Sequence, residues 1–99
     1  MNKRKEKIKI HPGKILLEEF INSKKLSINK VAKEININEN HLEEICNGTM
    51  DISTDIAYLL ATYFQNSVDY WLNLQRDYDL CFWGKELSHV IKEIQPYSN

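Results

Sequence analysis

The polar run from Asn38 to Glu44 carries side chains that could contact the edges of DNA bases. The amide of Asn40 can form two hydrogen bonds with adenine, and His41 can contact a phosphate or a guanine. Glu39 can accept a hydrogen bond from the amino group of cytosine. Three glutamates in so short a run nevertheless weaken the overall attraction to a polyanion.

Residues outside this run could hold the phosphate backbone. Ser27 could donate to a phosphate, although helix capping alone explains its position. The lysines that could flank a groove, or could be ordinary solvated side chains, are Lys14, Lys24, Lys25, Lys30 and Lys33, with the arm from Lys3 to Lys9. The candidate DNA-binding residues are therefore Lys14, Ser27, Lys30, Asn38, Glu39, Asn40, His41, Glu44 and Thr49.

The net charge of −1 conceals a strong division along the chain. From Met1 to Lys33 there are ten basic and three acidic residues, whereas from Glu34 to Asn99 there are three basic and eleven acidic ones. The two parts thus carry +7 and −8. A phosphate-binding surface must draw on the first third of the chain.

Other kinds of chemistry have little support in the sequence. His11, His41 and His89 lack the spacing of a metal site or a catalytic pair, and Cys46 and Cys81 form no CxxC motif. There is no Ser-His-Asp pattern and no glycine-rich phosphate loop. We therefore expect no enzyme activity, no metal and no cofactor.

The start of the chain does not resemble a secretory signal. Lys14, Glu18 and Glu19 interrupt the apolar residues after the basic beginning, and no stretch approaches the length of a membrane span. We expect a cytoplasmic protein with reduced thiols and no membrane partner.

These residues must be positioned by helices, because apolar residues recur at helical spacing and no long alternating run demands a sheet. The sequence predicts an all-α, single-core fold of five to six helices. Glycines and prolines, including Gly84, are expected to mark helix ends. The expected helices span about 13–23, 28–35, 38–47, 54–65, 68–80 and 85–94. We expect three regions: residues 1–10 as a basic arm, 11–81 as the helix-turn-helix domain with its dimerisation helix, and 82–99 as a C-terminal helix and tail.

The second and third predicted helices fit a helix-turn-helix pattern. Ala32 is small enough for the helices to cross closely, and Asn36 favours a left-handed turn. Ile37, Leu42 and Ile45 are apolar where the motif must pack on its own domain. The alternative is that any amphipathic helix pair would match some of these positions.

The fifth predicted helix has more large apolar residues than one face of an edge helix needs. We therefore expect the protein to form a homodimer through this helix. Stacking of its aromatic residues on single-stranded bases is a weaker alternative than core or dimer packing, because Arg76 is the only basic residue among them. The candidate dimer-interface residues are Val68, Trp71, Leu72, Gln75 and Tyr78.

Five segments carry a resemblance to a known family: His11–Leu16, Asn47–Gly48, Ile52–Asp55, Ala61–Phe64 and Tyr70–Leu80. Together they resemble the HigA-type antitoxins of the phage Cro/repressor-like (XRE) helix-turn-helix family. The resemblance covers about His11 to Leu80 and is most specific from Trp71 to Leu80. It implies a lambda-repressor-like fold, a dimer, binding to the protein's own operator, and neutralisation of a small, basic RelE-like (HigB-type) mRNA-cleaving toxin.

The chain departs from the family pattern at several DNA-contacting positions. The family usually has basic residues where this chain has His41, Thr49 and Met50, and a polar residue, commonly Gln, where it has Ile28. Each departure removes a phosphate or base contact. We expect a type II antitoxin that represses its own operon. One alternative is a stand-alone repressor. The other is an antitoxin that has lost DNA binding and binds only its protein partner.

Overall fold

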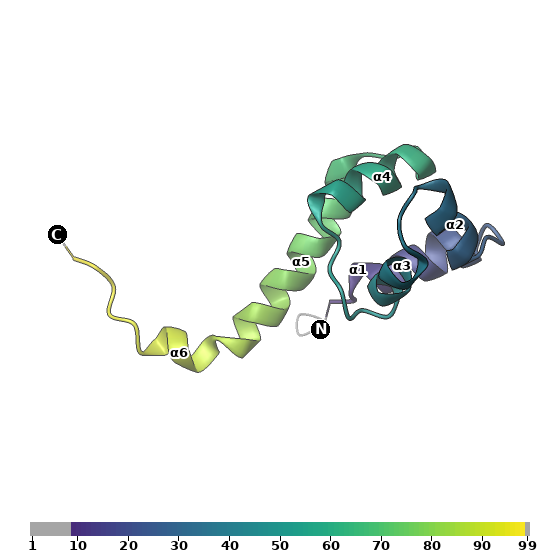
Figure 1. The fold of residues 1–99 in the computed structure, drawn as a ribbon. Helices are drawn as coiled ribbons and strands as arrows, with labels where there is room; N and C mark the ends of the chain where they lie inside the picture. Colours follow the sequence, from purple (N-terminus) through teal and green to yellow (C-terminus); the bar gives the residue numbers. More distant parts are fainter. Residues whose placement is uncertain (1–8, 99) are drawn as a thin grey trace, which may run out of the picture.

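A computed structural model describes residues 9–98, and within this range every regular element is helical. In Figure 1 the helical elements up to residue 64 and the start of the helix Val68–Glu86 form a small bundle, from which the rest of that helix projects. The elements are α1 (Pro12–Ile15), η2 (Leu16–Asn22), α2 (Ile28–Glu34), α3 (Glu39–Cys46), α4 (Thr54–Phe64), α5 (Val68–Glu86) and α6 (Ser88–Lys92). The predicted all-helical fold is confirmed.

The first predicted helix is present, but its turns widen part of the way along. His11 caps α1 by accepting a hydrogen bond from the Gly13 N–H at Nδ1 (2.9 Å), and Pro12 occupies the first turn. From Leu16 the backbone adopts the π register, with bonds between residues five apart. This register keeps Leu16 and Ile21, which are five apart and fully buried, on the same face.

The helix-turn-helix pattern is confirmed in detail. Ser27 and Asn38 cap α2 and α3 by accepting hydrogen bonds from backbone N–H groups. Asn36 has a φ of 62°, the left-handed conformation that its residue type favours. Leu42 and Ile45 are fully buried. The pair α2–α3 is therefore fixed to the rest of the bundle by its inner face.

Gly13 allows α1 to approach α3 at van der Waals distance. A Cβ atom there would lie 1.7 Å from the carbonyl oxygen of Ile45, which no side chain larger than hydrogen could tolerate. The close approach places the start of α1 directly against the C-terminal half of α3.

The core of the bundle is completed by α4 and the first turns of α5. Ile56 and Leu60 on α4 are buried together with Trp71 on α5. The indole N–H of Trp71 donates to Oδ1 of Asn66 (2.9 Å), so its one polar group is satisfied. The rings of Phe20 and Tyr70 pack against the indole, with centroids 4.9 and 5.0 Å away.

The C-terminal elements differ from the prediction. Gly84 lies inside α5, which continues to Glu86, and α6 is only five residues long, not the ten predicted from Lys85 to Ile94. A helical glycine costs only about 1 kcal/mol relative to alanine, so a single one does not end a helix. The predicted boundary between residues 81 and 82 falls within α5.

This projection of α5 and α6 makes the molecule extended (Figure 1). Its radius of gyration is 16.6 Å, whereas a compact chain of 100 residues has about 13 Å. Across residues 9–98, no helix combines the length and the apolar character needed to cross a membrane. The predicted basic arm of residues 1–10 lies mostly outside the described residues.

Candidate nucleic-acid interface

The exposed face of α3 presents the predicted base-contacting residue to solvent. Asn40 is exposed in the first turn of α3, and its backbone N–H donates to the Asn38 cap (2.8 Å). In the part of the chain that the structure describes, the Asn40 side chain forms no hydrogen bond, so its amide is free to contact a base. Asn38 already uses its side-chain oxygen as the cap and keeps only its amide N–H groups for DNA.

Glu39 is tied to the preceding helix by a residue that sequence reasoning missed. Nδ2 of Asn29, on α2, donates to Oε1 of Glu39 at 2.9 Å. This bond joins the N-terminal ends of α2 and α3. Only the three-dimensional crossing of the helices reveals it, because the two residues are ten apart in sequence.

His41 lies near the start of α4. It is half-buried and lies close enough to Asp55, in the first turn of α4, to contribute to a lowered pKa of that carboxyl. The main cause of the lowered pKa is the hydrogen bond that Asp55 accepts from the Ser53 hydroxyl. His41 thus has less freedom to reach DNA than Asn40 has.

Lys30 is engaged within the subunit. Its Nζ lies 2.8 Å from Oε2 of Glu34, whose other carboxylate oxygen accepts from the Tyr63 hydroxyl at 2.6 Å. The hydrogen bond and charge of Glu34 raise the pKa of Lys30, and Lys30 and Tyr63 in turn lower the pKa of Glu34. A phosphate that binds Lys30 must compete with this carboxylate.

The remaining predicted residues lie in two places. Ser27 caps the N-terminal end of α2, where its Oγ accepts a hydrogen bond from the Lys30 backbone N–H (3.0 Å). Its hydroxyl hydrogen stays available to donate to a phosphate. Lys14 is exposed, lies 3.8 Å from Glu18, and lines a shallow pocket of about 320 Å³ together with Gly48. The Thr49 hydroxyl donates to the carbonyl oxygen of Glu44 (3.2 Å). Two patches result, one at the N-terminal ends of α2 and α3 and one beside the C-terminal end of α3.

Two of the predicted dimer residues are buried within their own subunit. Trp71 is completely buried in its own subunit, and Gln75 is 6% exposed. Gln75 accepts from the Ile52 N–H at 2.7 Å and donates to Asp79 at 2.9 Å. Both side chains therefore stabilise the subunit and leave no surface for a partner. Their spacing on an apolar helix could not distinguish these roles.

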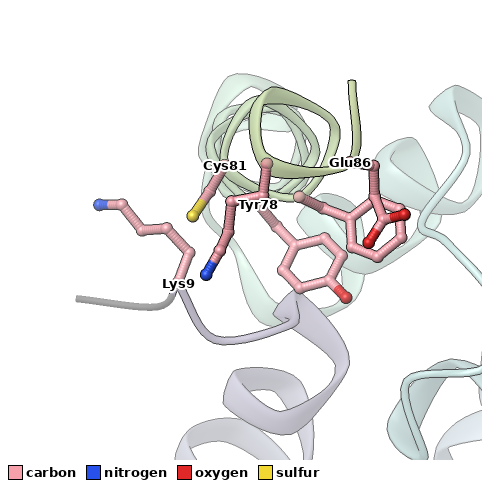
Figure 2. Close-up of a pocket in the computed structure, with 6 residues that line it drawn as sticks. Lys9, Tyr78, Cys81 and Glu86 are labelled. Carbon is pink, nitrogen blue, oxygen red and sulfur yellow. The ribbon is translucent and has the colours of Figure 1, made fainter. Parts of the chain in front are cut away.

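The other three predicted dimer residues, Val68, Leu72 and Tyr78, are half-buried. The ring of Tyr78 packs edge-on against His11, with centroids 4.9 Å apart. Figure 2 shows Tyr78 pointing from α5 toward the start of α1, beside a pocket of about 240 Å³ that Lys9 and Cys81 also line. Their contact with a second subunit stays a prediction.

A larger exposed apolar surface lies further along the chain. We call residues 80–94 the apolar C-terminal segment. Trp83 and Val90 within it are 52% and 53% exposed, although side chains of this size are usually covered. Its exposed apolar residues are Leu80, Phe82, Trp83, Leu87, Val90, Ile91 and Ile94.

Cys46 is a free cysteine that is buried in the bundle. Burial raises the pKa of the Cys46 thiol to about 11, with the charge of Glu43 adding to the effect, so the thiol stays protonated. Between residues 9 and 98, no three His, Cys, Asp or Glu side chains gather closely enough to hold a metal ion.

Comparison with known proteins agrees with this geometry. A family model described as "Helix-turn-helix" matches residues 17–71, more than half of the chain. An uncharacterized HTH-type transcriptional regulator of Escherichia coli, YbaQ, is 38% identical over 70% of this chain. The chain spans 61% of the length of that relative. The match defines the class of protein as helix-turn-helix.

Solved structures narrow the class further. An addiction module antidote protein of a HigA family from Coxiella burnetii is 42% identical, with 89% of this chain and 97% of that chain covered and a TM-score of 0.81. The Pseudomonas aeruginosa antitoxin HigA, solved with the higBA promoter, is 32% identical, with 90% and 98% covered and a TM-score of 0.84. This chain therefore belongs to the helix-turn-helix family and, within it, to the HigA family.

Proposed function

We propose that the protein is the antitoxin of a type II toxin–antitoxin module and that it represses its own operon by binding operator DNA. The observation that carries the DNA-binding part is the α2–α3 unit, which buries Leu42 and Ile45 and leaves Asn40 exposed at the start of α3. The P. aeruginosa relative solved with promoter DNA supports this proposal. We assign no catalytic role to the protein and place it in the cytoplasm with its operon.

In the proposed complex, α3 enters the major groove by its N-terminal end. Asn40 forms two hydrogen bonds with adenine, while Ser27, Lys30 and Lys14 hold phosphates on either side. Two copies place their α3 helices in successive major grooves, about one helical turn apart.

The DNA-binding proposal is tested by titrating the protein with the DNA upstream of its own reading frame over a series of salt concentrations. We expect a sequence-specific complex that weakens as salt rises, because phosphate contacts release counterions. Asn40→Ala should weaken the specific complex by about 1–3 kcal/mol. Asn73→Ala, the same change at an exposed position of α5, is the matched control and should leave affinity within about twofold.

Two outcomes would contradict the proposal in different ways. Unchanged affinity of Asn40→Ala would show that Asn40 contacts no base. The absence of any specific complex with the wild-type protein, even at low salt, would favour an antitoxin that binds only its protein partner. The five acidic and no basic residues between Asn36 and Asp55 are the observation behind that second candidate.

The partner that we propose for the second activity is a small, basic mRNA-cleaving toxin. The −8 charge from Glu34 to Asn99 complements such a protein. Co-expression with the product of the adjacent gene should relieve growth arrest and yield a complex that purifies together. If the adjacent product is neither toxic nor bound, the protein is a stand-alone repressor.

A further inference from the structure

Glu39 differs from the other glutamates of α3 because a second helix fixes its side chain. Asn29 Nδ2 donates to Glu39 Oε1 at 2.9 Å, and both side chains are exposed. A carboxylate only accepts hydrogen bonds, so the amide must turn its NH₂ group toward it. Within residues 9–98, Oε2 of Glu39 accepts no hydrogen bond and is free as an acceptor.

We propose that Glu39 determines one base of the operator, selecting a cytosine, and that Asn29 is the positioning residue that orients its carboxylate. The proposal rests on the proposed DNA-binding function. Glu39 is the first residue of α3, the end of a recognition helix that contacts base edges. The same end carries Asn40, the proposed adenine contact.

The choice of cytosine follows from the groups that each base presents in the major groove. Cytosine offers the N4 amino donor, which a free carboxylate oxygen can accept. Guanine presents acceptors at N7 and O6, and thymine presents one at O4, so both repel a carboxylate. Adenine places its N6 donor beside the N7 acceptor, which makes it a poorer partner than cytosine.

The hydrogen bond from Asn29 supports this selection by limiting the conformations of Glu39. A glutamate side chain loses rotamer freedom when it is immobilised at an interface. The hydrogen bond from Asn29 already removes part of the rotamer freedom of Glu39 before DNA binds. Glu43 is exposed on the same helix but has no such bond to a neighbouring helix in the described range, so it contributes charge rather than base selection.

The proposal is tested by selecting binding sites from a randomised DNA library with wild-type protein and with Glu39→Gln. Glutamine keeps an oxygen that accepts from Asn29, but its amide can form two hydrogen bonds with adenine. We expect one operator position to change from cytosine to adenine, with a roughly tenfold change in relative affinity for the two bases. Glu43→Gln removes the same charge and should raise affinity for all sequences without changing any base preference.

Asn29→Ala separates positioning from a purely structural role. It should reduce the preference for cytosine at the same position severalfold while the preference for adenine at the Asn40 position is retained. If Asn29→Ala lowers the melting temperature but leaves every base preference unchanged, Asn29 only holds the helices together and the positioning role is wrong.

Failure of this inference is distinguishable from failure of the proposed function. A wild-type protein that enriches no sequence at all would overturn the DNA-binding proposal itself. A wild-type protein that enriches an operator, together with a Glu39→Gln variant that enriches the identical sequence, would overturn only the assignment of Glu39.

Discussion

At the residue scale, the stability of the bundle depends strongly on the missing side chain at Gly13. A methyl group there would meet the Ile45 carbonyl oxygen at 1.7 Å, and that oxygen belongs to helical backbone that cannot rotate away. Gly13→Ala should therefore lower the free energy of unfolding by at least about 2 kcal/mol, as overpacking does in a tightly packed core. Chemical denaturation followed by circular dichroism measures this change.

The matched control is Gly84→Ala, which makes the same substitution where a Cβ would meet nothing within 4 Å. Because Gly84 lies inside α5, alanine should raise helix stability by up to about 1 kcal/mol. Equal effects of the two substitutions would show that the contact between α1 and α3 does not limit stability.

Single residues also show which parts of the site the sequence could predict. The caps at Ser27 and Asn38 and the turn at Asn36 follow from local backbone chemistry, so their residue types identify them. The bond between Asn29 and Glu39 depends on how two helices cross, and no local pattern encodes it. For Trp71 the sequence left core packing and dimer packing open for the same reason, since an apolar residue on a helix fits a core and an interface equally well; the structure buries it in the core.

At the element scale, the turn between α2 and α3 sets the direction in which α3 leaves α2. Asn36 adopts a φ of 62° there, and Ile37 N–H donates to the Ala32 carbonyl across it (3.0 Å). A β-branched residue is poorly suited to this conformation, which costs roughly 1–2 kcal/mol for ordinary side chains. Asn36→Val should therefore reduce the free energy of unfolding by about that amount, measured in urea.

Asn36→Gly is the control for this turn, because glycine adopts positive φ without a steric cost. It should remain close to the wild type in stability and should keep operator affinity. If valine and glycine destabilise the protein equally, the side chain of Asn36 matters for a reason other than its backbone conformation.

The sequence predicts a helix boundary where a helix-ending residue such as glycine is also required by the packing of the chain at that point. It does not predict the boundary where the residue type stands alone. The third helix ends at Asn47–Gly48 as expected, since Gly48 has a φ of 83° and reverses the chain against His11. Gly84 has the same residue type but no such requirement, and α5 continues through it. The change of register at Leu16 follows from packing of the first helix and has no marker in its residue types.

At the scale of the whole molecule, the protein consists of a packed bundle and an apolar C-terminal segment that leaves it (Figure 1). The bundle buries its own apolar residues, including Leu60 and Trp71. The segment exposes seven large apolar residues that nothing in the described part of the subunit covers. We infer that the proposed homodimer forms through this segment rather than through Trp71 and Gln75.

Trp83→Asp tests that interface, because Trp83 is 52% exposed and has the largest side chain among the exposed apolar residues of the segment. A buried tryptophan at the centre of an interface contributes on the order of 2 kcal/mol or more, and in a symmetric dimer each copy contributes it. Loss of both contributions, about 4 kcal/mol in all, should raise the dimer dissociation constant by roughly several hundredfold, measured by sedimentation equilibrium. Tyr58→Asp introduces the same charge at an aromatic residue that is 60% exposed on α4, and it should leave the dimer intact. A Trp83→Asp protein that dimerises as tightly as the wild type would locate the interface elsewhere, and loss of the dimer in Tyr58→Asp alone would move it to α4.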